Sequence, residues 1–192
     1  LVMNSETEST NHYPVRQPDT DTYRFWEIAG AAHGCTGGSR FMLTSWPRDL
    51  GLDRHPMAPA ANNNVLTHEP VNAAALAHLH RWANGGAPAP AQPRLEFAGD
   101  PPRLQRDAHG IAKGGIRLPA VAAPRARHTG VDADGLLEMF GTTTPFTAET
   151  LAALYPPEAP YRDRLKRAVD DAVRAGTILA ADAETMLAVT FG

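Results

Sequence analysis

Several features are scarce or missing in this chain of 192 residues, and each narrows what the protein can be. A single cysteine, Cys35, excludes a disulfide bond within the chain. No apolar run approaches the length needed to cross a bilayer, so no membrane partner is expected. The net charge is only −3, and no basic stripe carries interleaved aromatic residues. The sequence therefore predicts no nucleic-acid partner.

Apolar residues are also somewhat few, at 43% of the chain, whereas glycine and proline are frequent. The 16 glycines and 17 prolines make up about a sixth of the sequence. This composition favours long connections over dense secondary structure. The length still suffices for an ordinary domain with a sizeable core.

The stretch from Tyr23 to His33 has the clearest pattern in the chain. Its first half alternates aromatic and aliphatic residues with charged ones, which predicts a strand packed on at least one face. The small residues 29–32 then predict a sharp turn that ends at His33. A histidine on a loop after a strand is well placed for proton transfer. An ordinary surface histidine is the simpler interpretation of His33 taken alone.

Two carboxylates follow a second short apolar run, Leu1–Met3. Functional groups of α/β sheets gather beyond the carboxyl ends of the strands, where Glu6 and Glu8 are expected. They share a face if the strand continues, and only one faces a cleft if the chain has turned. A solvated acidic loop is the simpler interpretation of either residue taken alone.

An acid after one strand and a Gly-x-x-His sequence after the next resembles the last third of an α/β-hydrolase. More narrowly, six segments resemble a family known as the α/β-hydrolase domain, and they extend over nearly the whole chain. These segments are Asn4–Glu8, Arg16–Asp21, Trp26–His33, Leu76–Trp82, Gly114–Pro119 and Phe140–Phe146.

The resemblance implies an α/β fold in which this chain forms the last strands of the sheet, with flanking and C-terminal helices. It also implies serine-hydrolase chemistry on small carboxylic esters, with His33 as the general base. Glu8 or Glu6 would be the orienting acid, and Glu8 matches the usual acid position better. No metal and no organic cofactor are implied.

The chain departs from the family pattern at the nucleophile. None of its four serines, which are Ser5, Ser9, Ser39 and Ser45, lies in a Gly-x-Ser-x-Gly frame. Acyl transfer without a nucleophile and an oxyanion hole loses most of its acceleration. We therefore expect the chain to be the C-terminal portion of a hydrolase. Its partner would be the N-terminal portion that carries the serine, without which it would be inactive. The alternative is a non-catalytic, hydrolase-like binding or assembly module.

Three regions are expected along the chain: a core part carrying the acid and histidine (1–86), a Pro/Gly-rich extended and hairpin segment (87–146) and a helical appendix (147–192). Apolar spacing predicts a helix after Pro70, with one apolar face formed by Val71, Ala75, Leu79 and Trp82. Further helices are predicted after Thr147, Pro160 and Asp182. These three residues and Pro70 mark the helix starts.

The remaining candidate groups have simpler explanations. Cys35 could act as a nucleophile with His33, but two positions on one loop give poor geometry, and a small packed thiol explains it better. His68, His78 and His80 lack a zinc spacing and are expected to be solvated helix histidines. The Gly114-Gly115 pair is attributed to tight packing.

Overall fold

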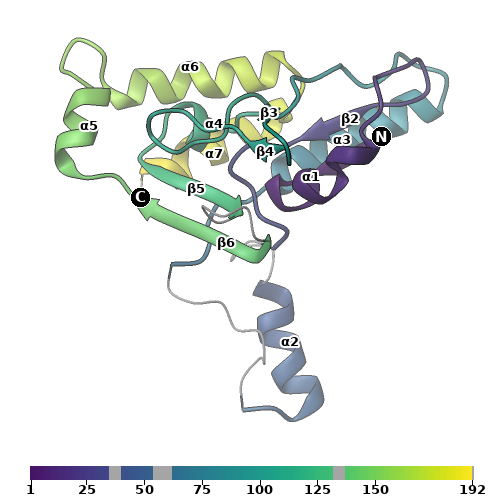
Figure 1. The fold of residues 1–192 in the computed structure, drawn as a ribbon, viewed down its shortest axis with the longest axis horizontal. Helices are drawn as coiled ribbons and strands as arrows, with labels where there is room; N and C mark the ends of the chain where they lie inside the picture. The colour runs from purple at the N-terminus through teal and green to yellow at the C-terminus, as the bar shows by residue number, and fades with distance from the viewer. Residues whose placement is uncertain (35–39, 54–61, 132–136, 192) are drawn as a thin grey trace.

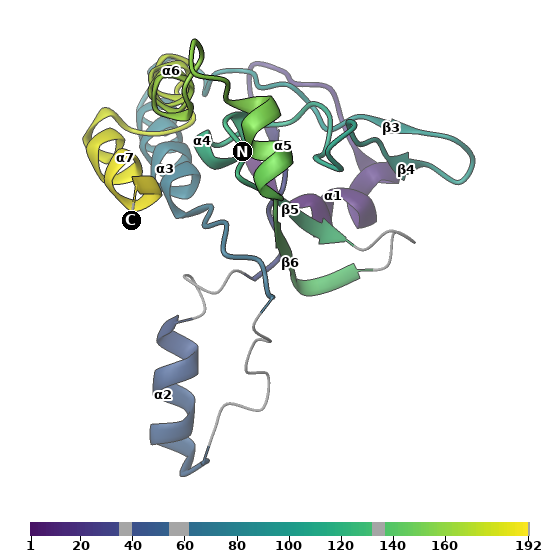
Figure 2. The ribbon, with the colours of Figure 1, turned by 90° about the vertical axis from the view of Figure 1, so that its left-hand side faces the viewer.

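The computed structural model describes residues 1–34, 40–53, 62–131 and 137–191 (Figure 1). Cys35 and Ser39 lie outside these ranges. Most helices and strands gather in one body, and α2 (Arg40–Leu50) projects away from it in both views (Figures 1 and 2). Within the described ranges, every helix is too short or too polar to span a bilayer.

Two short parallel strands form the centre of the site. β1 (Val2–Asn4) pairs with β2 (Phe25–Glu27), with Asn4 opposite Glu27. β2 is shorter than the sequence predicted, and all three of its side chains are buried. The buried Glu27 carboxylate forms an ion pair with Arg16 and accepts a hydrogen bond from the amide of Leu95 (3.0 Å). Parallel pairing brings the carboxyl ends of both strands to one edge, with α1 (Glu6–His12) after β1.

The main hydrophobic core combines side chains from β2, from α3 (Glu69–Ala83), from residues 89–121 and from residues 169–178. Trp26, Ile28 and Val71 belong to one buried cluster. The helix predicted after Pro70 is confirmed. Val71 and Ala75 of the predicted apolar face are buried and Trp82 packs against the core, but Leu79 is exposed. Ala74 is buried as well, so the helix packs most closely through its first half.

The segment before α4 (Pro119–Ala122) is extended and largely irregular. It holds a small antiparallel pair, β3 (Phe97–Ala98) with β4 (Arg103–Leu104). Gly114 and Gly115 both have positive φ, and a Cβ on Gly114 would lie 2.1 Å from the carbonyl oxygen of Arg94. The interpretation of this glycine pair as tight packing is confirmed.

A second antiparallel pair, β5 (Ala126–Val131) with β6 (Leu137–Pro145), lies beside α1. The remaining elements are helical: η1 (Tyr13–Val15), α5 (Ala148–Leu154), α6 (Tyr161–Arg174), η2 (Ala180–Asp182) and α7 (Ala183–Phe191). Thr147 caps α5 and α6 follows Pro160, as predicted. Val169, Ala172 and Ile178 share the main core with Trp26, so this region packs into the body of the molecule.

Candidate functional site

The start of α1 determines where the two candidate acids lie. Ser5 caps the helix: its hydroxyl accepts a hydrogen bond from the amide of Thr7 (3.1 Å), and its own amide donates to Glu8 Oε2 (2.9 Å). This reciprocal capping box begins the helix immediately after β1. Residues two apart on a helix point about 200° from each other, so the carboxylates face different surroundings. The sequence left open whether the strand continues or the chain turns at these residues. The structure shows that the chain turns into α1.

Glu6 is completely buried and all its contacts are structural. Its Oε1 accepts from the amide of Gly30 (2.7 Å), and its Oε2 accepts from the amide of Gly130 (3.0 Å) and from Arg106 Nη2 (2.9 Å). These bonds connect α1 to three segments distant in sequence. Both oxygens are thus engaged away from His33.

Glu8 is the carboxylate that meets His33. Its Oε1 is hydrogen-bonded to His33 Nδ1, while its Oε2 accepts from the Ser5 hydroxyl (2.5 Å). The His33 side chain is 60% exposed and that of Glu8 only 25%. With Nδ1 engaged, Nε2 is the ring nitrogen left for a reactant. We call Glu8 and His33 the acid–base pair.

The electrostatics keep the Glu8 carboxyl ionised. Partial burial raises its pKa, but the hydrogen bonds from Ser5 and His33 outweigh this and hold the pKa below its usual value. Glu8 is therefore an anion at neutral pH. It can fix the tautomer of His33 with the proton on Nδ1 and stabilise an imidazolium.

The turn that delivers His33 is held by close packing. Gly30 has a φ of +77°, and a Cβ there would lie 3.2 Å from both Leu66 Cδ2 and His128 Cβ. The amide of His33 donates to Thr7 Oγ1 (3.2 Å), whose hydroxyl donates to the carbonyl of Gly130 (2.8 Å). One threonine of α1 thus connects the histidine loop to β5.

His68 is the group near the pair that sequence reasoning missed. It is partly buried, and its Nδ1 has no hydrogen-bond partner among the described residues. Burial lowers its pKa, while the charges of Glu8 and Glu69 act in the opposite direction. The expectation of a solvated histidine is wrong here, and also for His78, which is bonded to the carbonyl of Gly176 (2.9 Å). Only His80 is exposed as predicted.

No serine in the described ranges is hydrogen-bonded to His33. Ser5 caps α1, while Ser9 and Ser45 are buried. A search of the same residues for three or more clustered His, Cys, Asp or Glu side chains that could hold a metal ion returns none. The described part of the chain therefore holds an ionised carboxylate bonded to His33, with no serine hydroxyl bonded to the ring.

The parallel strand pair and the oriented acid–base pair can be set against known proteins. Residues 1–188 match a family model described as an alpha/beta hydrolase domain. The chain belongs to this family. No curated protein and no solved structure matches it. The α/β fold expected from the sequence is confirmed for this α/β-hydrolase domain.

Proposed function

We propose that this chain supplies the acid and base of a serine-type α/β-hydrolase that cleaves small carboxylic esters. The observation that carries the proposal is the bond between Glu8 Oε1 and His33 Nδ1 at the carboxyl ends of two parallel strands. Family membership supports hydrolysis, and a carboxylate-bound imidazole with a free Nε2 suits activation of a hydroxyl.

In this mechanism His33 Nε2 takes the proton of a serine hydroxyl as its oxygen attacks the ester carbonyl. Glu8 remains ionised, holds the ring orientation and stabilises the imidazolium. His33 then returns the proton to the leaving alkoxide as the carbon–oxygen bond breaks. A water molecule, deprotonated in the same way, releases the acid and restores the serine.

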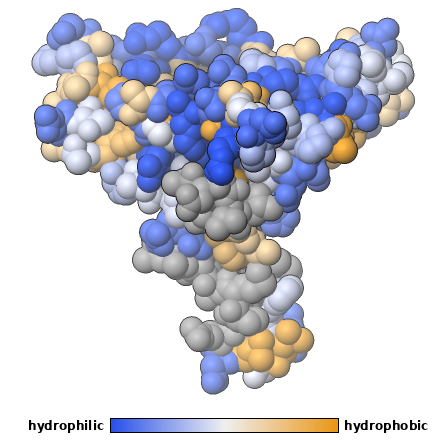
Figure 3. Space-filling model, viewed as in Figure 1, coloured by the Kyte–Doolittle hydropathy of each residue, from blue (hydrophilic) through white to orange (hydrophobic). Residues whose placement is uncertain are grey.

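The nucleophile would come from the N-terminal portion of the hydrolase. Two features favour such a partner. Parallel sheets are normally larger and covered on both faces, yet β1 has a strand on only one edge within the described residues. The arm formed by α2 also exposes Trp46, Leu50 and Leu52, and Figure 3 shows apolar surface at its far end. Without its partner we expect this chain to be inactive.

The direct test measures hydrolysis of 4-nitrophenyl butyrate by the complete protein. His33→Ala should lower kcat/KM by about a thousandfold or more, because the base is removed. His80→Ala is the matched control, since this histidine is exposed on α3. Glu8→Gln should also lower kcat strongly, because the amide cannot stabilise the imidazolium.

Turnover unchanged by His33→Ala would remove this residue from the reaction. A complete protein without any serine that reacts with a fluorophosphonate probe would contradict serine chemistry. That second outcome would favour a non-catalytic binding or assembly module, which the absence of a Gly-x-Ser-x-Gly sequence already makes the main alternative.

A further inference from the structure

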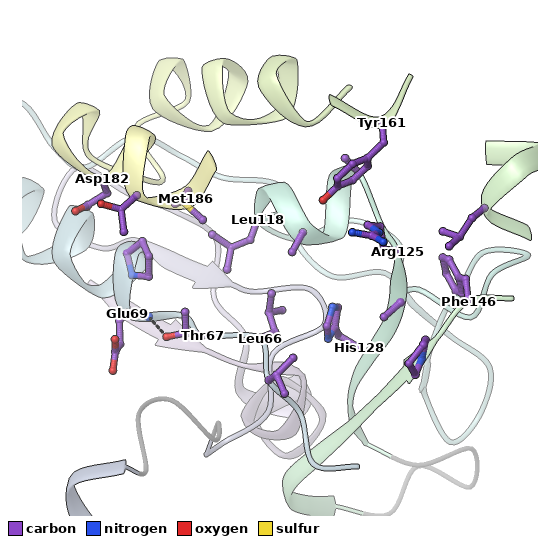
Figure 4. Close-up of a pocket in the computed structure, with 18 of the residues that line it drawn as sticks. Leu66, Thr67, Glu69, Leu118, Arg125, His128, Phe146, Tyr161, Asp182 and Met186 are labelled. Atoms are coloured by element: carbon purple, nitrogen blue, oxygen red, sulfur yellow. Dashed lines mark hydrogen bonds between the residues drawn. The ribbon is translucent and has the colours of Figure 1, made fainter. Parts of the chain in front are cut away.

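A large cavity is bounded by residues 65–67 and by parts of α3, α4, β5 and α7. Its volume is about 940 Å³, within the usual range for small-molecule sites. Leu66 and Thr67 form one wall, and Leu118, Phe146 and Met186 provide much of the rest (Figure 4). The walls are mainly apolar, so an occupant needs an apolar body.

Charge is distributed unevenly around this cavity. Arg125 lies at one end, near His128 and Phe146, whereas Glu69 and Asp182 lie at the other (Figure 4). The Arg125 guanidinium lies over the ring of Tyr161, 5.4 Å from its centroid, and has no hydrogen bond or ion pair within the described part of the chain. Asp182 Oδ2 is buried and also has no partner there. An anion is therefore attracted to the Arg125 end and repelled from the opposite one.

His128 adds a neutral donor at the same end. Its side chain lines the cavity from β5, and the residue is only 7% exposed. Burial lowers the pKa of His128 to about 4, so the ring is uncharged at neutral pH. Thr143 Oγ1 accepts from the amide of Val65 (3.0 Å) and lies 3.0 Å from His128 Nδ1. When the Thr143 hydroxyl donates its proton to Nδ1, the ring proton lies on Nε2, where the ring can donate it to a ligand.

We propose that this cavity binds an amphipathic carboxylate, with the carboxylate at Arg125 and His128 and the apolar body between Leu66, Leu118 and Met186. A guanidinium binds a carboxylate through charge-assisted hydrogen bonds, and the imidazole N–H can serve the second oxygen. An uncharged occupant of the same shape would make no charge-assisted hydrogen bond to Arg125, so the charge distribution favours a carboxylate. The site is distinct from the acid–base pair and does not depend on esterase activity.

The experiment measures binding of decanoate, below its micellar concentration, to the complete protein by titration calorimetry at neutral pH. Decanol is the uncharged probe of equal chain length. Arg125→Gln should weaken decanoate binding about tenfold or more and leave decanol binding unchanged, because only the charged contact is lost. Arg127→Gln is the matched control: Arg127 lies two residues further along the chain, is exposed and is not part of the cavity lining.

Ala120→Phe should reduce binding of both probes, since Ala120 lines the cavity and the larger ring fills it. Circular dichroism would verify that each variant is folded. If Ala120→Phe does not fold, Ala73→Phe, which also fills the cavity, takes its place. The proposal is overturned if decanoate does not bind, or if it binds no better than decanol. Equal effects of Arg125→Gln and Arg127→Gln would also overturn it, as would decanoate affinity that survives filling of the cavity.

Discussion

Glu6 and Glu8 stand two residues apart on one helix, yet their surroundings differ completely. Glu6 is buried among two backbone amides and Arg106, so every contact it makes holds segments together. Glu8 is partly exposed, and one of its oxygens holds an imidazole that is itself open to solvent. The comparison teaches that burial and the identity of the partners, rather than position in the sequence, separate a structural carboxylate from one suited to chemistry.

The largest expected effect comes from removing the buried carboxylate. Glu6→Ala leaves Arg106 and two amides without their acceptor, and should lower the free energy of unfolding by about 3–5 kcal/mol. Equilibrium urea unfolding measures this loss. Glu8→Ala is the matched variant and should cost about 1 kcal/mol, since it removes mainly a helix-capping contact. Equal losses for the two variants would erase the distinction between the carboxylates.

A medium effect is expected where β5 approaches the histidine loop. A Cβ on Gly130 would lie 2.3 Å from the backbone oxygen of Ala31 and 3.0 Å from Glu6 Cβ. Gly130→Ala should therefore destabilise the protein by about 1–3 kcal/mol, because backbone must move. Gly34→Ala is the control: its Cβ would meet the ring of Phe140 at 3.0 Å, and a side chain can shift more easily. If thermal unfolding shows a larger loss of stability for Gly34→Ala than for Gly130→Ala, the packing described around Gly130 is contradicted.

The smallest effect concerns pH. Because the folded pKa of Glu8 lies below its usual value, its ionised form stabilises the fold above the unfolded pKa. This contribution is lost as the pH falls through the folded pKa. Glu8→Gln should thus be less stable than the parent protein by about 1 kcal/mol at neutral pH, and the difference should shrink in acid.

Urea unfolding measured from pH 7 down to pH 3 follows this dependence. Glu149→Gln is the control, because Glu149 is also in the first turn of a helix but far from His33 in the sequence. A Glu8→Gln difference that grows toward acid would show that Glu8 is not stabilised as an anion.

Local patterns in the sequence predicted a good part of this fold. Apolar spacing located α3 and α6, and Thr147 was recognised as a cap. Functional groups gather beyond the carboxyl ends of strands, and parallel strands end at the same edge of a sheet. This rule predicted an acid and His33 at one edge. These features depend on residues close in sequence, or on one simple rule of sheet geometry.

Other contacts could not be predicted because they join distant segments. Arg106 reaches Glu6 across 100 positions, and nothing local identifies this pairing. Arg16 lies in a polar connection, yet it neutralises the buried Glu27 and bonds to the carbonyl of Leu95 (2.7 Å). The partial burial of His68 is likewise not evident from its place just before a helix. The partners of buried charged groups are therefore the main part of the site that local sequence patterns cannot predict.

Among the described residues β1 has a strand on only one edge, and this has a consequence for producing the protein. Unpaired amides and carbonyls along a strand attract any extended segment that passes, including another copy of the same chain. If this chain were produced by itself at high concentration, we would expect copies to cluster through that edge. Co-production with a segment able to add a third strand should keep the copies apart.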